Sequence, residues 1–213
     1  MLSPQLKTRL ITAATLIPVV LLVLKINGFL LLAAAVICAA LALYEWVGLY
    51  RKPTILFAAM GLSILVGFYS LTMICYGPTG FYDGLILFMA VWASDSFAYL
   101  FGKKFQGPKM APTISPNKTW AGLAGAVIGS TLVMAIAYST SELISHALVV
   151  GLLIGLLGQT GDLLESALKR QSGVKDSGAL FPGHGGLLDR LDALFFAAPI
   201  MLHFHMFING LPL

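Results

Sequence analysis

Charged residues are scarce in this 213-residue sequence. They make up 10% of it, whereas hydrophobic residues make up 58%, and the mean hydropathy is +0.90. A soluble domain carries about 25% charged residues, so this composition excludes an ordinary water-soluble globular protein. It predicts an integral membrane protein built from helices, because a bilayer gives the backbone no water to bond and a helix satisfies its own N–H and C=O groups.

Cysteine is also nearly absent. Cys38 and Cys75 both lie in apolar stretches, and their spacing fits neither a metal site nor a disulfide framework. We interpret them as packing residues. The glycines of the later apolar stretches follow no predicted strand, so they do not form a nucleotide-binding glycine loop. The spacings 125 to 129 and 151 to 155 instead predict close contact between helices.

Seven apolar stretches are long enough to cross a bilayer, which takes about 20 mostly apolar residues. They lie at 10–26, 29–49, 54–75, 81–101, 119–139, 143–163 and 191–208. The predicted fold is therefore all-α: a polytopic transmembrane helix bundle of about seven spans.

Basic residues fall on one side of these spans. Every Lys and Arg except Lys25 lies before the first span or after the second, fourth or sixth. The positive-inside rule makes this side cytoplasmic. We therefore expect a multi-pass protein of the inner (cytoplasmic) membrane with a cytoplasmic amino terminus and both long polar loops facing the cytoplasm.

The second and fourth apolar stretches contain three carboxylates, which are costly there. Asp95 sits about two turns inside the fourth span, and we favour a functional role for it. The alternative is a helix-to-helix hydrogen bond supported by Ser94 and Ser96. We expect Asp83, at the outer end of that span, to reach water, and interpret Glu45 as a carboxylate that extends to the interface.

A polar segment precedes the fifth span and brings together a cation, an amide and two hydroxyls. Its candidate binding residues are Ser115, Asn117, Lys118 and Thr119. A helix N-terminus adds free N–H groups and partial positive charge, so we expect an anionic head group here. A cluster that only fixes topology is the alternative. Thr119 or Asn117 should cap the helix in either case.

The densest charge lies between Ser166 and Asp192, around a Pro-Gly-His-Gly-Gly turn. The charged residues are Lys169, Arg170, Lys175, Asp176, Asp189, Arg190 and Asp192. Cations suit a polyphosphate, and carboxylates suit a hard metal ion. Asp162, Asp189 and Asp192 are placed to collect one or two Mg²⁺ ions, while Gly185 and Gly186 allow an N–H nest for phosphate oxygens.

The sixth helix connects this region to the membrane. If it continues past the apolar stretch, Asp162 and Glu165 share one face with Ser166 and Lys169.

At these residues the sequence resembles the phosphatidate cytidylyltransferases, also called CDP-diacylglycerol synthases. The signature of that family is matched without a gap by Ser166, Lys169, Arg170, Lys175, Asp176, Gly178, Pro182, His184, Gly185, Gly186, Asp189, Arg190 and Asp192. The segments around Asp95 and Ser115–Trp120 also look like family features, so the resemblance covers roughly Phe81 to the end. Two departures are the short amino-terminal region and Ala121, where family members often carry an acid.

The resemblance implies a reaction in phospholipid biosynthesis: CTP and phosphatidic acid give CDP-diacylglycerol and pyrophosphate, with Mg²⁺ and room for a second cation. It implies metal binding by Asp162 and Asp189, with Asp192 beside them. The implied partners are CTP, phosphatidic acid and the bilayer, with no nucleic acid, and a homodimer is left open.

The resemblance also distributes the other roles. The implied ligands of triphosphate, pyrophosphate and lipid phosphate are Lys169, Arg170, Lys175 and Arg190. Asp176 and Asp95 organise the site or hold a second cation. His184 either donates to a phosphate oxygen or only shapes the turn. Ser166, Gly185 and Gly186 complete the implied substrate site.

We accordingly divide the chain into amino-terminal scaffold helices at 1–80 and a catalytic transmembrane domain at 81–213, with cytoplasmic loops at 102–118 and 164–190. Two other functions stay open at this point. One is a CTP-dependent lipid kinase of the dolichol-kinase type, and the other is a cation transporter that uses Asp95 and Asp162.

Overall fold

The structure is a computed structural model that describes residues 18–25, 29–76, 79–181 and 185–210. Its elements are α2 (Phe29–Gly48), α3 (Ile55–Tyr76), α4 (Gly80–Phe105), β1 (Lys109–Ala111), β2 (Ser115–Thr119), α5 (Trp120–Ala137), α6 (Ile144–Gln171) and α7 (Leu188–Ile208). Residues 18–25 are also helical. Most of the first predicted span lies outside the described residues.

The prediction of an all-α membrane bundle is confirmed. The six helices α2 to α7 are each long and apolar enough to cross a membrane. Their bounds match the predicted spans closely, but α4 continues to Phe105 and α6 to Gln171. The first residues of the predicted loops 102–118 and 164–190 are therefore helical. Because α6 continues past the apolar stretch, Asp162 and Glu165 share one of its faces with Ser166 and Lys169, as expected.

The segment between α4 and α5 contains a feature that the sequence analysis did not predict. β1 and β2 form a two-stranded antiparallel hairpin, with Lys109 opposite Thr119 and Ala111 opposite Ser115. Pro108 and Pro112 prevent a continuous helix here, and the strands give the backbone groups of this segment their partners. The hairpin delivers residues 117–119 directly to the start of α5.

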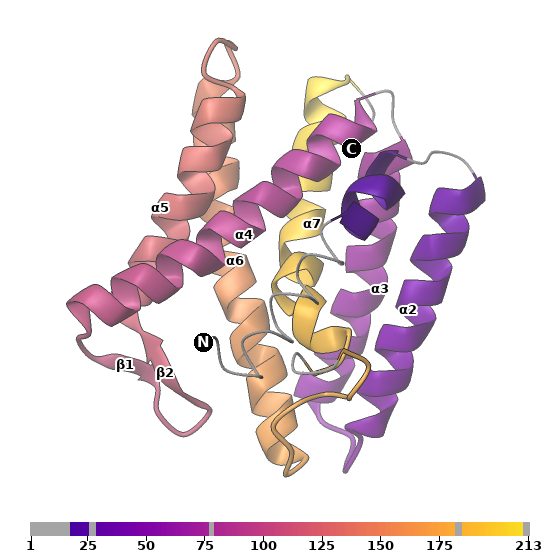
Figure 1. Cartoon of the computed structure of the whole chain (residues 1–213), viewed down its shortest axis with the longest axis vertical. Helices are drawn as coiled ribbons and strands as arrows, with labels where there is room; N and C mark the ends of the chain where they lie inside the picture. The colour runs from indigo at the N-terminus through magenta and orange to yellow at the C-terminus, as the bar shows by residue number, and fades with distance from the viewer. Residues whose placement is uncertain (1–17, 26–28, 77–78, 182–184, 211–213) are drawn as a thin grey trace, which may run out of the picture.

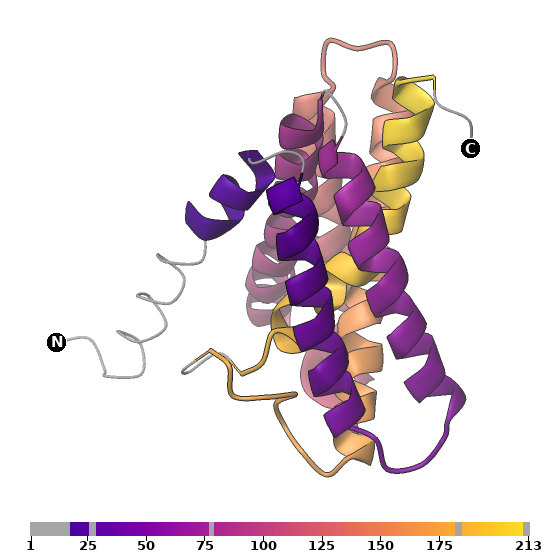
Figure 2. The same ribbon diagram turned by 90° about the vertical axis from the view of Figure 1, so that its right-hand side faces the viewer.

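Helix α7 contacts α2, α3, α4 and α6, while α5 packs against α4 and α6. In Figure 1, α4 crosses the bundle obliquely and runs along α5 toward the hairpin. We call the end that holds the hairpin and the α2–α3 and α6–α7 connections the polar end; it lies at the bottom of Figures 1 and 2. The opposite end holds the α3–α4 and α5–α6 connections.

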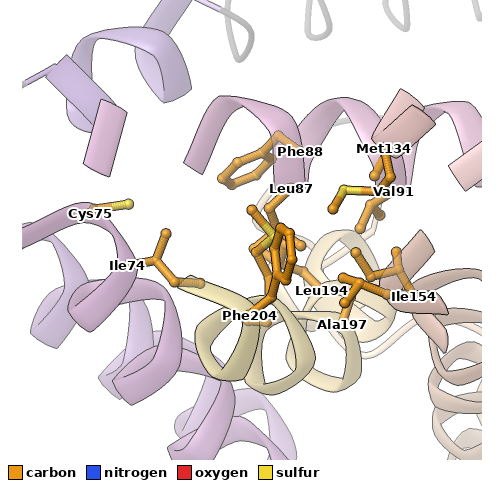
Figure 3. Close-up of a cluster of buried hydrophobic side chains, with 14 of the residues drawn as sticks. Ile74, Cys75, Leu87, Phe88, Val91, Met134, Ile154, Leu194, Ala197 and Phe204 are labelled. Atoms are coloured by element: carbon orange, nitrogen blue, oxygen red, sulfur yellow. The ribbon is translucent and has the colours of Figure 1, made fainter. Parts of the chain in front are cut away.

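A buried apolar cluster fills the centre of the bundle. Figure 3 shows side chains of this cluster, among them Ile74 of α3, Leu87 and Val91 of α4, Met134 of α5, Ile154 of α6 and Leu194 of α7. Leu87 and Ile74 have no exposed surface. Because lipid is as apolar as these side chains, close packing rather than escape from water holds the helices together.

Glycines bring α4, α5 and α6 into close contact, as their spacing predicts. An added Cβ would lie 2.6 Å from the Ala93 oxygen at Gly129 and 2.6 Å from the Thr131 Cα at Gly151. Gly129 therefore lets α4 approach α5 at Ala93, two residues before Asp95, and this contact sets the depth at which Asp95 lies.

The prediction that Asp83 reaches water is wrong. Asp83 is only 4% exposed. Its carboxylate lies 2.7 Å from the Nδ1 of His205 and accepts hydrogen bonds from the Thr79 and Tyr138 hydroxyls. A buried carboxylate needs such partners. These contacts join α4, α5 and α7 at the opposite end, and the apolar Leu87 separates them along α4 from Asp95.

We expect Gly129→Ala to lower the stability of the bundle by about 1–3 kcal/mol, since the added methyl overpacks the contact with Ala93. Thermal unfolding of the detergent-solubilised protein measures this loss. Gly48→Ala is the matched control, because an added Cβ there meets nothing within 4 Å. Equal unfolding temperatures for the two variants would contradict the packing described here.

Candidate active site

A cavity of about 470 Å³ opens at the polar end, where α4, β2, α5, α6 and α7 meet. The charged residues that line it are Asp95, Lys118, Asp162, Glu165, Lys169, Arg170, Lys175, Asp176, Asp189, Arg190 and Asp192. Asn117 and Thr119 line it too. The structure thus brings together most of the predicted site residues, from segments almost 100 residues apart.

An acidic triad, formed by Asp162, Glu165 and Asp192, lines this cavity. One carboxylate oxygen of each lies within 4.8 Å of the others. Asp162 and Glu165 are one turn apart on α6, whereas Asp192 follows the start of α7. Three carboxylates this close repel one another unless a cation lies between them.

The acidic triad fits a divalent cation on a second ground. Glu165 has no exposed surface, and its Oε1 has no hydrogen-bond partner among the described residues. A buried carboxylate oxygen without a partner is costly, and a hard cation with oxygen ligands would satisfy it. Asp162, Glu165 and Asp192 are the residues placed to hold one.

Lys169 connects the acidic triad to the start of α7. Its Nζ lies 2.8 Å from Glu165 Oε2 and 2.5 Å from Asp189 Oδ1, and the residue is only 8% exposed. The ammonium therefore forms an ion pair with one carboxylate from each of two helices. Its burial makes both pairs strong, because little water screens them.

Asp189 does not belong to the acidic triad. Besides Lys169, its carboxylate accepts hydrogen bonds from the Ser177 N–H and hydroxyl and from the Gly186 N–H. Asp189 thus organises the loop before α7, and its role as a metal ligand stays a prediction. The Gly186 N–H is engaged by this carboxylate.

Lys118 approaches the acidic triad from the hairpin. Its Nζ lies 2.7 Å from Asp162 Oδ2 and donates to the Gln159 carbonyl oxygen. Thr119 accepts a hydrogen bond from the Gly122 N–H, which confirms it as the cap of α5. Asp95 faces the cavity and accepts a long hydrogen bond, 3.4 Å, from the Gln159 side chain.

Three further cations face the cavity without a carboxylate partner. Arg170, Lys175 and Arg190 are exposed, and none of them belongs to an ion pair between described residues. Arg170 donates to the carbonyl oxygen of Val174. Their charge is thus available to an anion in the cavity.

A few predicted site residues lie elsewhere. Ser166 does not line the cavity, and its hydroxyl donates a hydrogen bond to Asp162. Ser115 pairs with Ala111 in the hairpin. Gly185 has φ +79° and forms a bridge with Phe181. His184 lies outside the described residues.

Two residues of this region were missed as site residues. Glu165 was expected on the same helix face as Asp162, but no role was assigned to it. Its position three residues after Asp162 was the signal that it could bind the same ion. The interpretation of Glu45 as a carboxylate that extends to the interface is wrong. Glu45 is only 8% exposed, and its carboxylate accepts hydrogen bonds from the Leu187 and Leu188 N–H groups. No local pattern in the sequence signals this contact.

The fold and the cavity define a class: a multi-pass membrane protein with a polar cavity at one end of its helix bundle, rich in both carboxylates and cations. The chain belongs to the cytidylyltransferase family, whose model matches residues 52–208.

Curated relatives support this assignment. Proteins named phosphatidate cytidylyltransferase are similar to the chain in Brucella abortus (40% identity, 78% of this chain, 62% of the relative), Rickettsia felis (36%, 75% and 74%) and Haemophilus influenzae (43%, 60% and 48%). The chain thus spans less than two thirds of the length of the Brucella relative.

We expect Lys169→Met to destabilise the fold by about 3 kcal/mol or more, because it leaves Glu165 and Asp189 buried without their cation. Thermal unfolding in detergent is the measurement. Lys175→Met is the control: it removes an exposed cation, and such a change stays within about 0.5 kcal/mol. Equal losses in the two variants would refute the buried linkage.

Proposed function

We propose that this chain transfers a cytidylyl group from CTP to phosphatidic acid, giving CDP-diacylglycerol and pyrophosphate with Mg²⁺. The observation that carries the proposal is the cavity itself, at the end of a membrane bundle. There the acidic triad lies beside cations that have no carboxylate partner among the described residues. Membership in the cytidylyltransferase family and the names of the relatives support the same reaction.

The chemistry asks for charge neutralisation rather than an activated nucleophile. Phosphatidic acid already carries an anionic phosphate oxygen, which attacks the α-phosphorus of CTP. The bond between that phosphorus and the oxygen that bridges to the β-phosphorus then breaks, and pyrophosphate leaves with the bonding electrons. The barrier lies in bringing two anions together in line and stabilising the charge that develops.

The residues of the cavity divide these tasks. Asp162, Glu165 and Asp192 would hold Mg²⁺, which supplies charge neutralisation at the phosphate oxygens when bound. Arg170 and Arg190 face the cavity as cations for the triphosphate and the leaving pyrophosphate. The planar guanidinium of each can bind a phosphate through two N–H groups.

The lipid is proposed to bind along the part of the cavity wall that α4, α5 and the hairpin form together. On this side the cavity wall combines the apolar Ala98 and Leu123 with Asn117 and Lys118 of the hairpin. An acyl chain in the bilayer would lie along the apolar residues, while the phosphate would meet the amide and the ammonium. Lys118, whose Nζ contacts Asp162 in this structure, would be free to pair with that phosphate if Asp162 binds a cation.

The polar end is proposed to face the cytoplasm. Apart from Lys25, the Lys and Arg residues of the connections gather there. The positive-inside rule associates such residues with the cytoplasmic side. CTP is a cytoplasmic nucleotide, so this orientation gives the cavity access to its substrate. An inner-membrane location and a homodimer remain part of the proposal.

The direct test incubates purified protein with CTP labelled on the α-phosphate, phosphatidic acid and Mg²⁺. We expect labelled CDP-lipid and pyrophosphate from the wild type. Glu165→Gln should lower kcat at least about a hundredfold, or about 2.7 kcal/mol, because it removes a charge from the acidic triad. Glu142→Gln, an exposed acid near the opposite end, is the matched control and should retain activity.

Product analysis separates the rival functions. Lipid phosphate with CDP as the second product would identify a CTP-dependent kinase. Cation flux in liposomes without CTP would identify a transporter. Either result, or wild-type kcat in Glu165→Gln, would contradict the proposal.

A further inference from the structure

Glu45 lies on α2 and contacts the start of α7, although the two are 142 residues apart in the sequence. Its Oε1 accepts a hydrogen bond of 3.0 Å from the Leu187 N–H, and its Oε2 accepts one of 2.8 Å from the Leu188 N–H. The first amides of a helix have no acceptor within the helix, and their partial positive charge favours a carboxylate. Leu187, at the N-cap position, provides no side-chain cap. A residue of another helix therefore caps α7.

The same carboxylate reaches toward the acidic triad through Ser177. The Ser177 hydroxyl lies 3.0 Å from Glu45 Oε2 and 2.9 Å from Asp189 Oδ2, and its single proton can be donated to only one of them at a time. Asp189 in turn binds Lys169, which binds Glu165. An unbroken series of polar contacts thus connects α2 to the acidic triad.

The loop before α7 fits closely around this carboxylate. An added Cβ at Gly178 would lie 2.6 Å from Glu45 Oε1, and one at Gly186 would collide with both carboxylate oxygens. Both glycines therefore allow the loop backbone to approach Glu45 directly. Because the contact is tight, a displacement of Glu45 moves the loop and the first turn of α7, which carries Asp189 and leads to Asp192.

We propose that Glu45 is a positioning residue for the reaction. It does not line the cavity, and it acts by holding the start of α7 so that Asp192 meets Asp162 and Glu165, while Asp189 holds Lys169. The effect on catalysis rests on the function proposed above. A misplacement of about 1 Å in reacting groups can cost about a hundredfold in rate, so an indirect role is large enough to measure.

Glu45→Gln tests this role because it keeps the shape of the side chain, removes its charge and leaves only one oxygen to accept the two amides. We expect kcat to fall about ten- to a hundredfold, with KM for CTP and lipid changed less than about threefold. The Mn²⁺ concentration needed to half-fill the protein, measured by electron paramagnetic resonance, should rise about tenfold. Amide hydrogen exchange at Leu187 and Leu188 should accelerate.

Ser177→Ala keeps both amide contacts of Glu45 and removes the hydroxyl that lies between Glu45 and Asp189. It should lower kcat by a smaller factor and leave exchange at Leu187 and Leu188 unchanged, and Ser177→Thr should restore activity because it keeps the hydroxyl. This pair tests the proposal even if Glu45→Gln does not fold.

Asp83→Asn is the matched control, since it alters a buried, hydrogen-bonded carboxylate at the opposite end. It should lower the unfolding temperature without changing kcat, Mn²⁺ binding or exchange at the start of α7. A folded Glu45→Gln with wild-type kcat and wild-type exchange would overturn the proposal, and so would parallel losses of stability and kcat in both variants. Mn²⁺ binding and hydrogen exchange need no turnover, so a wild type that makes no CDP-lipid would contradict the proposed reaction alone.

Discussion

The buried ammonium of Lys169 is the interaction on which the polar end depends. It lies between Glu165 of α6 and Asp189 of α7, and the residue is only 8% exposed. Removing two or more charges from water is costly unless each finds its counter-charge in good geometry. The beginning of α7 can therefore approach the end of α6 only with Lys169 in place, and this approach brings Asp192 to Asp162 and Glu165.

The arrangement of the helices separates this charged region from the remainder of the bundle. Apolar side chains from α3 to α7 fill the centre, and glycines on α5 and α6 let neighbouring backbones touch. Such contacts give transmembrane helices a fixed geometry without help from the hydrophobic effect. The charged groups can then concentrate at one end, while Asp83 and His205 form a separate buried pair at the other.

Local patterns in the sequence predicted much of this structure. Hydropathy located the six described spans, glycine spacing located the close helix contacts, and Thr119 was correctly expected as a possible cap of α5. The proximity of Asp162 and Asp192 followed from placing both at adjoining helix ends. The spans, the glycine contacts and the cap depend on residues within a few turns of one another, or on a rule that holds for any membrane helix.

The errors concern buried carboxylates whose partners are distant in the chain. Glu45 bonds Leu187, 142 residues away, and Asp83 bonds His205, 122 residues away. Hydropathy indicates only that such a carboxylate is costly in an apolar stretch. Whether water or another helix satisfies it depends on how the helices pack. The hairpin was missed because its prolines exclude a helix without specifying a strand pair.

The most direct measurement is the anomalous scattering of Mn²⁺ in crystals of the protein. The account predicts a Mn²⁺ peak enclosed by the carboxylates of Asp162, Glu165 and Asp192, within about 2.0–2.6 Å of their oxygens, with Lys169 still between Glu165 and Asp189. A peak on other residues, or well-ordered carboxylates in this acidic triad with no peak between them, would contradict it.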